Sequence, residues 1–232
     1  PIWQTIAATL EAEIGQGRYR PGDKLPTEAA LAARFGVNRH TVRHALADMG
    51  ARGLVRSRRG AGVFVAAEPT LYPIGKRTRF HQNIRATGRL PEKRVLRLET
   101  RPADEGEAGA LELDTGADVV VYEGLSLAGG AAVAHFESVF PAARLPGLAA
   151  ALGEVTSVTE ALRRVGVADY IRAETRITAE RANATQALHL NLREGDPLLR
   201  TTALNTTPDG TPVEYGRTWF AGERVALTVA PD

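Results

Sequence analysis

The chain of 232 residues is 44% hydrophobic and 24% charged, enough for a normal globular core in one large or two modest domains. No run of about 18 apolar residues occurs, so the sequence excludes a transmembrane helix. Cysteine is absent, which excludes disulfides and thiolate metal sites and fits a cytoplasmic protein. The net charge of +2 conceals an asymmetry, because residues 1–100 hold 18 Lys/Arg and 8 Asp/Glu whereas residues 101–232 hold 11 and 19. The first part is therefore suited to a polyanionic partner.

The first 50 residues predict three helices. The N-terminal stretch of residues 1–17 lacks the basic-then-apolar pattern of a signal peptide. It is predicted to be a folded helix, because Trp3, Ala7, Leu10 and Ile14 form one apolar face. Thr27 can cap the second helix, and Gly36 stands where a left-handed C-cap is needed. Asn38 can cap the third helix, which has an inward stripe of Val42, Ala45, Leu46 and Met49. Its solvent side then carries Arg39, His40, Arg43 and His44.

Residues 54–65 predict a two-stranded hairpin with a basic, glycine-containing tip at Arg58, Arg59 and Gly60. A basic helix after a short turn has the shape of a recognition helix for the DNA major groove. A small basic hairpin can approach a phosphate backbone or a minor groove. The alternative is an ordinary helical core with a solvated charged face. The order of cap, turn, basic helix and basic hairpin favours DNA binding.

The motifs PGDKLPTE, FGVNRHTVRHAL and GLVRSRRGAGVFV occur in this order within residues 1–66. They closely resemble the N-terminal winged helix-turn-helix of the GntR family of bacterial transcription regulators. The resemblance implies that bases and phosphates are contacted from the turn and the start of the recognition helix, at Asn38, Arg39, His40, Thr41 and Arg43. It also implies that the tip of the wing is Arg59-Gly60.

The chemistry of these side chains divides the expected contacts into two kinds. Arg39 and Arg43 can each pair bidentately with O6 and N7 of guanine. Asn38, Thr41 and Arg58 are expected on phosphates, which position a protein without reading the sequence. Because one recognition helix reads only a few base pairs, we expect a homodimer on a palindromic operator.

The second half of the chain predicts an α+β domain. Residues 67–76 contain Pro69, Pro73 and Gly75 without periodicity, and are expected to link a domain at 1–66 to one at 77–232. Strands are expected at 95–98, 119–127, 131–140, 170–178, 198–206, 213–220 and 225–229. Capping-box patterns predict short helices after residues 104 and 157. The hairpin turns at Gly129-Gly130 and Pro208-Asp209-Gly210 indicate a mainly antiparallel sheet.

A weak internal repeat with an offset of 79 relates the two parts of this domain. It aligns Leu98 with Ile177, Gly116 with Gly195, and Leu125 with Leu204. Each copy reads as strand, short helix, turn and hairpin. The repeat predicts a pseudo-symmetric sheet with a ligand cleft where its halves meet. The alternative explanation of the similarity is that both parts use the same common turn residues without being related.

Arg77-Thr78-Arg79-Phe80 and the segments GGAAVAHFESVFP and PDGTPVEYG resemble the UTRA effector domain of the HutC branch of GntR regulators. The segments LYPIGKRTRF and GVADYIRAETRITAERA further resemble the regulators of phosphonate and phosphate-ester metabolism. That domain is similar in fold to chorismate lyase. The resemblance implies a repressor that responds to a small effector. Relatives that sense phosphorylated sugars often carry Arg-x-Arg where this chain has Leu125 and Leu127, so a phosphate, a phosphonate or another phosphate ester is the expected class, with a carboxylate as the alternative.

An oxyanion is best bound by guanidinium groups and by a helix N-terminus, as at Ser157. The candidate effector residues are Arg77, Thr78, Arg79, Glu137, Ser157, Tyr170, Arg172, Glu214, Tyr215 and Arg217. Each of these residues also has an alternative role that involves no effector. Arg77 and Arg79 can solvate the linker or contact DNA. Ser157 can be a helix cap alone, and Arg172 can be a surface ion-pair partner.

Catalysis finds little support. The five histidines lack metal spacing, and no GxSxG, P-loop or GxGxxG motif occurs. No cofactor is therefore expected. An enzyme domain of the chorismate-lyase type remains the alternative for the second half, because the resemblance in fold permits it.

Overall fold

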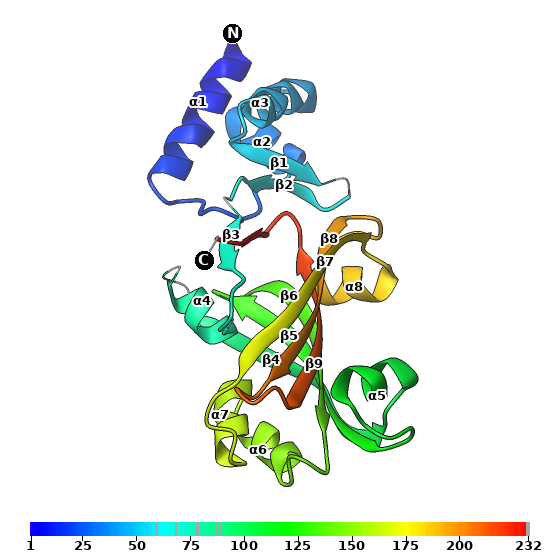
Figure 1. Cartoon of the computed structure of the whole chain (residues 1–232). Coiled ribbons are helices and arrows are strands. Elements are labelled where there is room, and N and C mark those ends of the chain that lie inside the picture. The colour runs from blue at the N-terminus through cyan, green and yellow to red at the C-terminus, as the bar shows by residue number, and fades with distance from the viewer. Residues whose placement is uncertain (59, 68, 78, 87, 89, 231–232) are drawn as a thin grey trace. The chain divides into compact units, whose positions relative to one another are not determined.

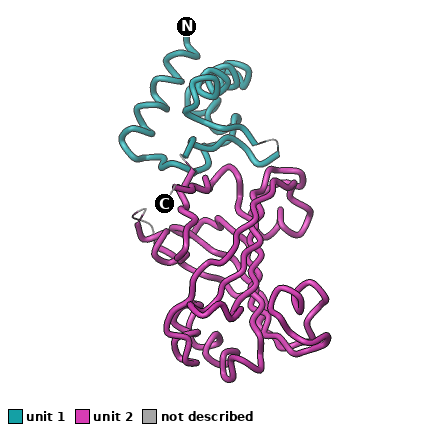
Figure 2. Tube along the Cα trace, in the orientation of Figure 1, with its two compact units in different colours: residues 1–68 teal, residues 69–232 magenta. Residues whose placement is uncertain are grey.

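A computed structural model describes residues 1–58, 60–67, 69–77, 79–86, 88 and 90–230. The chain divides into two compact units, residues 1–68 and 69–232 (Figure 2). The second contains an α+β fold built on an antiparallel sheet, as the sequence predicts.

The first unit contains three helices, α1 (Ile2–Gly15), α2 (Glu28–Phe35) and α3 (Arg39–Ala51). Thr27 caps α2 by accepting a hydrogen bond from the backbone N–H of Ala30, and Gly36 ends it in the left-handed conformation (φ 64°). The stripe predicted on α3 is buried against the other two helices, in a core that includes Leu10, Leu31, Val42, Leu46 and Met49. These contacts fix the solvent side of α3.

The wing follows α3 as β1 (Val55–Arg58) and β2 (Gly62–Val65), paired antiparallel with Arg56 opposite Phe64. Residue 24 forms an isolated antiparallel bridge with Phe64, and the N–H of Leu25 donates to the carbonyl of Val63. The wing is therefore hydrogen-bonded to the segment that precedes α2.

The segment expected to link the domains differs from the prediction. Residues 70–73 form β3 (Thr70–Pro73), which pairs in parallel with β10 (Val225–Thr228). These residues thus belong to the second unit. A four-residue strand whose partner lies at the other end of the chain has no local hairpin signal, so the sequence pattern does not reveal it.

The main sheet has six strands in the order β4-β5-β6-β9-β8-β7 (Figure 1). Their bounds are β4 (Pro91–Pro102), β5 (Asp118–Ala128), β6 (Ala131–Pro141), β7 (Ile171–Arg181), β8 (Pro197–Thr206) and β9 (Pro212–Ala221). The two three-stranded meanders meet at the antiparallel pair β6–β9. Bulges interrupt the pairing in β4–β5, β5–β6, β7–β8 and β8–β9.

The internal repeat is visible in the helices that follow β4 and β7. These are α5 (Glu105–Leu111) and α8 (Ala184–Leu190), and each begins with a complete capping box. Each also ends at a residue with positive φ, Glu112 (51°) and Asn191 (49°), which are 79 positions apart. The two halves are therefore alike in local structure as well as in sequence.

Helices cover both faces of the sheet. On one face lie α4 (Phe80–Ala86), α6 (Leu148–Glu154) and α7 (Val158–Arg164), where a core includes Tyr122, Phe136, Phe140, Leu148 and Leu162. On the other face α5 packs through Leu111 on Val119, Val121 and Val139, and α8 packs through Leu190 on Leu198. The helices α5 and α8 each contact the half to which they do not belong, through β9 and β6.

Gly124 lets an aromatic ring lie against β5. A Cβ atom at this position would lie 2.5 Å from the carbonyl oxygen of Arg94 and 3.0 Å from the ring of Phe136. The carbonyl is backbone and cannot rotate away, so a larger residue must displace β4 or the ring.

We expect Gly124→Ala to lower the free energy of unfolding by about 1–3 kcal/mol, because the added methyl group overpacks this contact. Urea denaturation measures the change. Gly109→Ala is the matched control, since it lies in α5 with no atom within 4 Å of its Cβ position. Alanine should stabilise that helix by up to about 1 kcal/mol. Equal effects of the two substitutions would contradict the packing argument.

Candidate functional site

The start of α3 presents a basic surface that includes Arg39, His40 and Arg43, all exposed. Asn38 caps the helix, since its Oδ1 accepts hydrogen bonds from the backbone N–H (2.8 Å) and the hydroxyl (2.9 Å) of Thr41. The predicted phosphate contacts Asn38 and Thr41 are thus held together at the helix start. Partial positive charge at this end of a helix favours an approaching anion.

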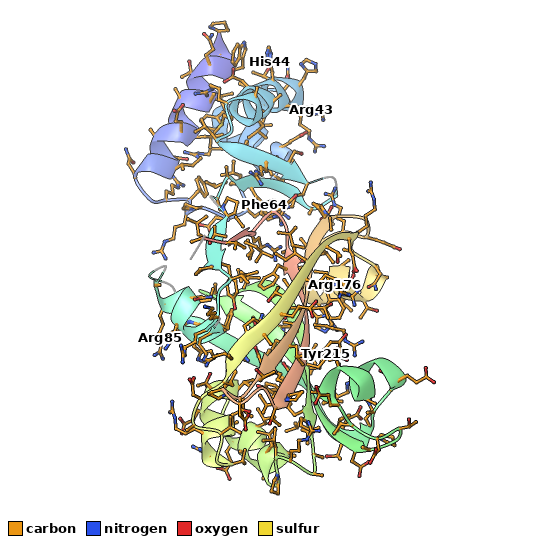
Figure 3. The ribbon with its side chains drawn as sticks, viewed as in Figure 1. Arg43, His44, Phe64, Arg85, Arg176 and Tyr215 are labelled. Atoms are coloured by element: carbon orange, nitrogen blue, oxygen red, sulfur yellow. The ribbon has the colours of Figure 1, made fainter. Side chains whose placement is uncertain are left out.

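Arg43 is paired with Glu28 of α2 through two hydrogen bonds, of 2.8 and 3.3 Å. The pair holds the pKa of Glu28 below its usual value. Because the Arg43 side chain is 65% exposed, the pair is weak and can exchange for another anion at little cost. His44, labelled in Figure 3, is exposed as predicted. Its ring also stacks on that of Trp3 of α1, with centroids 4.4 Å apart.

The wing carries further positive charge close to aromatic surface. The guanidinium carbon of Arg58 lies 4.7 Å from the ring centroid of Phe64, which is labelled in Figure 3. Gly60 adopts φ 78°, a conformation that suits glycine at a tight turn. Arg59 lies outside the described residues.

A cavity of about 270 Å³ lies on the face of the six-stranded sheet that α4 and α7 cover. Both halves of the sheet line it, with Phe136 and Ser138 from the first half and Asn205 and Glu214 from the second. This is the location that the internal repeat predicts. The lining carries four cationic side chains, Arg79, Lys93, Arg163 and Arg172, and two carboxylates, Glu160 and Glu214.

Five of the predicted effector residues line this cavity, namely Arg79, Ser157, Tyr170, Arg172 and Glu214. The guanidinium carbon of Arg79 lies 3.6 Å from the ring centroid of Tyr170, and its Nη2 donates to the carbonyl of that residue (2.7 Å). The Tyr170 hydroxyl is within 2.9 Å of the hydroxyl of Thr159. Burial raises the pKa of Tyr170, so its phenol is neutral at physiological pH.

A buried polar chain runs across β6, β9, β8 and β7. The two carboxylate oxygens of Glu214 accept hydrogen bonds from Ser138 Oγ and Asn205 Nδ2, both 2.7 Å long. The Oδ1 of Asn205 accepts from Arg172 Nε (2.7 Å), and Arg172 Nη1 donates to Thr175 Oγ1 (3.2 Å). These bonds hold Arg172 in place at the cavity.

Ser157 caps α7 but forms only half of the predicted capping box. Its hydroxyl accepts from the backbone N–H of Glu160 (3.3 Å), whereas the Glu160 carboxylate pairs with Arg163 (2.8 Å). In a complete capping box the Glu160 carboxylate would accept from the backbone N–H of Ser157, but here it accepts from Arg163.

Four candidate effector residues among the described ones do not line the cavity, namely Arg77, Glu137, Tyr215 and Arg217. Arg77 pairs with Asp169 (2.6 Å), and Thr78 lies outside the described residues. Three more belong to the opposite face of the sheet, Glu137, Tyr215 and Arg217. Successive side chains of a strand point to opposite faces, so the cavity receives their neighbours Ser138, Glu214 and Thr218.

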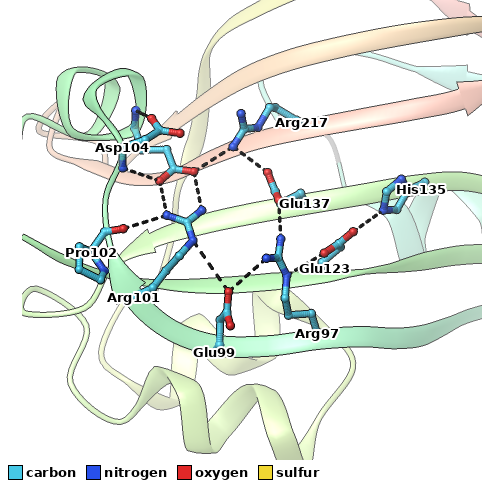
Figure 4. A network of polar contacts seen from close by, with 10 residues as sticks. Arg97, Glu99, Arg101, Pro102, Asp104, Glu123, His135, Glu137 and Arg217 are labelled. Atoms are coloured by element: carbon cyan, nitrogen blue, oxygen red, sulfur yellow. Dashed lines mark hydrogen bonds and ion pairs between the residues drawn. The ribbon is translucent and has the colours of Figure 1, made fainter. Parts of the chain in front are cut away.

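On that opposite face the charged side chains form a network with four carboxylates, Glu99, Glu107, Glu123 and Glu137 (Figure 4). Glu107 accepts two hydrogen bonds from Arg101 (2.7 and 2.8 Å) and one from Arg217 (2.9 Å), and its side chain is fully buried (0% exposed). Arg217 also pairs with Glu137, which Arg97 joins to Glu123. Hydrogen bonds from Arg101 are the largest cause that lowers the pKa of Glu107.

Several polar residues that line the cavity were not predicted from the sequence, including Lys93, Ser126, Ser138, Asn205 and Thr218. Asn205 carried a signal, because it lies in a predicted strand opposite Glu214. Lys93 carried little signal, because it precedes the predicted strand at 95–98 and a bulge between Val95 and Arg97 interrupts the alternation of faces within that strand.

Two negative findings concern the described residues only. None of their His, Asp and Glu side chains forms a group of three that could hold a metal ion. Among their helices, none is long and apolar enough to cross a membrane.

Comparison with known proteins gives matches over nearly the whole chain. Residues 3–65 match the gntR family of bacterial regulatory proteins, and residues 86–226 match the UTRA domain. The chain is 36% identical to the uncharacterized HTH-type transcriptional regulator RB1450 of Rhizobium meliloti and 36% identical to the probable transcriptional regulator PhnF of Escherichia coli, each match covering 98% of this chain and 94% of the relative. The crystal structure of PhnF from Mycobacterium smegmatis superimposes with a TM-score of 0.66 at 27% identity, covering 98% of this chain and 99% of that one.

We expect Glu107→Gln to lower the free energy of unfolding by about 2–3 kcal/mol, because Arg101 and Arg217 lose their shared buried carboxylate. Glu105→Gln, an exposed change in the same turn, should alter it by less than about 0.5 kcal/mol. Since the pKa of Glu107 is lowered in the folded state, its contribution is present above the usual pKa of 4.5 and lost as the pH falls through the lower value. Urea titrations at several pH values measure both effects, and equal losses in the two variants would refute the buried pairing.

Proposed function

Because this chain belongs to the GntR family of bacterial regulatory proteins and carries a UTRA domain, we propose that it is a repressor whose affinity for its operator is set by a small anionic metabolite. The chain is a DNA-binding transcription regulator and not an enzyme, like its relatives. The metabolite, its site and the dimeric state are the proposed parts.

The observation that carries the proposal is the cationic excess of the cavity between the two halves of the sheet. Four cationic side chains and two carboxylates line it, and both oxygens of Glu214 already accept hydrogen bonds within the protein. A ligand with a phosphoryl or phosphonyl group supplies the missing negative charge. Arg79, Tyr170 and Arg172 are the proposed contacts from the predicted set, with Ser157 at the adjacent helix start.

For DNA we propose a homodimer that places one α3 helix in each of two successive major grooves of a palindromic operator. Arg39 and Arg43 would contact guanines, and Asn38, Thr41 and the wing arginines would contact phosphates. The exposed pair of Arg43 with Glu28 supports this role, because the guanidinium is held ready by a contact that costs little to break.

We expect Arg43→Ala to weaken operator binding by about 1–3 kcal/mol and to relax sequence preference at one position of each half-site. Fluorescence anisotropy with operator and mismatched DNA measures both. Arg52→Ala removes an exposed, ion-paired arginine at the other end of α3 and should bind as the wild type does. Glu28→Gln removes the same ion pair without removing Arg43, so an equal loss in this variant would assign the effect to the pair and contradict base contact by Arg43.

Control by the metabolite requires that it bind the DNA-incompetent state more tightly than the operator-bound state. A thermal-shift screen of phosphate, sulfate, phosphonates, phosphorylated sugars and carboxylates identifies the class, since a ligand of the native state raises the melting temperature.

For the metabolite that binds, we expect operator DNA to weaken its affinity by about 1–3 kcal/mol, a typical coupling, and the metabolite to weaken operator binding by the same factor. Calorimetry with and without operator tests this reciprocity. Equal affinities in the two titrations would mean that the ligand does not control the repressor.

A further inference from the structure

Lys93 differs from the other cationic residues of the cavity, because it forms no hydrogen bond and no direct ion pair among the described residues. Its Nζ lies 4.4 Å from the ring centroid of Phe136 and 5.4 Å from that of Tyr122. The three arginines are engaged, because Arg79 donates to a backbone carbonyl, Arg163 pairs with Glu160, and Arg172 donates to Asn205. An ammonium group can donate three hydrogen bonds, and here the protein supplies only ring faces.

The surroundings of Lys93 disfavour its charge. Burial lowers the pKa of Lys93 to about 8, although the negative charge of Glu214 acts in the opposite direction. Glu214 forms no hydrogen bond with Lys93 among the described residues, and its two oxygens accept from Ser138 and Asn205 instead. The cavity therefore holds an amine that lacks an acceptor, next to a space large enough for a small molecule.

We propose that Lys93 is the residue that binds the anionic group of the ligand, and that above about pH 8 its amine takes up a proton when the ligand binds. This inference rests on the proposed function of the cavity as an anion site. The ring faces of Phe136 and Tyr122 hold the amine, and the ligand oxygens supply the acceptors that the protein does not. The arginines then serve as neighbours that are already fixed, rather than as the primary anchor.

If Lys93 takes up a proton on binding, the affinity for the ligand must depend on pH in a characteristic way. The ring of Tyr122 lies 5.4 Å from the amine, and the other charged and titratable groups that line the cavity with it are Tyr72, Arg79, His81, Glu160, Arg163, Tyr170, Arg172 and Glu214. Burial lowers the pKa of His81 and raises that of Tyr122, so the changes of charge of these two groups lie outside the range from pH 8 to 9.5. Affinity for a dianion should be constant below pH 8 and fall by up to about tenfold per pH unit above it, as the free protein loses the Lys93 proton.

The test compares Lys93→Met, Lys93→Arg and the control Arg163→Met by calorimetry with inorganic phosphate, methylphosphonate and sulfate at pH 7. Arg163 also lines the cavity, but its side chain is 60% exposed and paired with Glu160. We expect Lys93→Met to weaken binding by about ten- to a hundredfold and Arg163→Met by less than about threefold. Lys93→Met should also melt at or above the wild-type temperature, since it removes a desolvated cation.

A pH series with sulfate, which remains a dianion throughout, tests the proton uptake. The wild type should lose affinity between pH 8 and 9.5, whereas Lys93→Arg should bind with little change over this range because its guanidinium does not deprotonate.

The outcomes separate the inference from the proposed function. The role of Lys93 would be overturned if the wild type bound an anion and Lys93→Met bound it with the same affinity. It would also be overturned if Lys93→Met and Arg163→Met lost equal affinity. Either result would leave the anion site in place. A flat wild-type pH series would overturn the proton uptake. A wild type that binds none of the three anions would overturn the anion site and this inference together.

Discussion

The antiparallel pairing of β6 with β9 is the contact on which the second unit depends. It joins two similar meanders, and both the cavity and the charged network cross it. Ser138 and Glu214 meet on one face of this junction, while Glu137 and Arg217 meet on the other. The helices α5 and α8 reinforce it, since each packs on the strand of the other half. Neither half could form the cavity or the network alone, so the proposed ligand site also depends on the pairing of the halves.

The sheet separates charge between its two faces. On the covered face opposite the cavity, the carboxylates of Glu107, Glu123 and Glu137 are saturated by arginines, and a fully buried carboxylate is stable only with such partners. On the cavity face the cationic groups outnumber the carboxylates. An acidic part of the chain can therefore contain a site suited to anions, because its negative charge is neutralised elsewhere. Net charge by itself would have suggested the opposite.

In the first unit the helix α3 is fixed by the core, whereas its exposed basic side chains are only weakly paired. The core and caps fix the direction of α3, and the exposed charges are held only by weak pairs such as Arg43 with Glu28. A rigid helix with weakly held basic side chains suits contact with DNA, because the frame needs no rearrangement while the side chains exchange partners freely.

The sequence by itself determined the local structure and the class of protein. Caps at Thr27 and Asn38, the apolar stripe of α3 and the hairpin turns are short-range signals, and the structure contains them all. The repeat with an offset of 79 is also visible in the sequence, because each of its copies is built from such local signals. Only the tertiary structure decided which side chains share a face. A bulge between residues 95 and 97 turns Lys93 to the cavity and Arg97 to the network, and another between residues 172 and 174 separates Arg172 from Arg176 in the same way. A single extra residue reverses the face of every side chain beyond it, and its position depends on pairing with a distant strand, which no local pattern encodes.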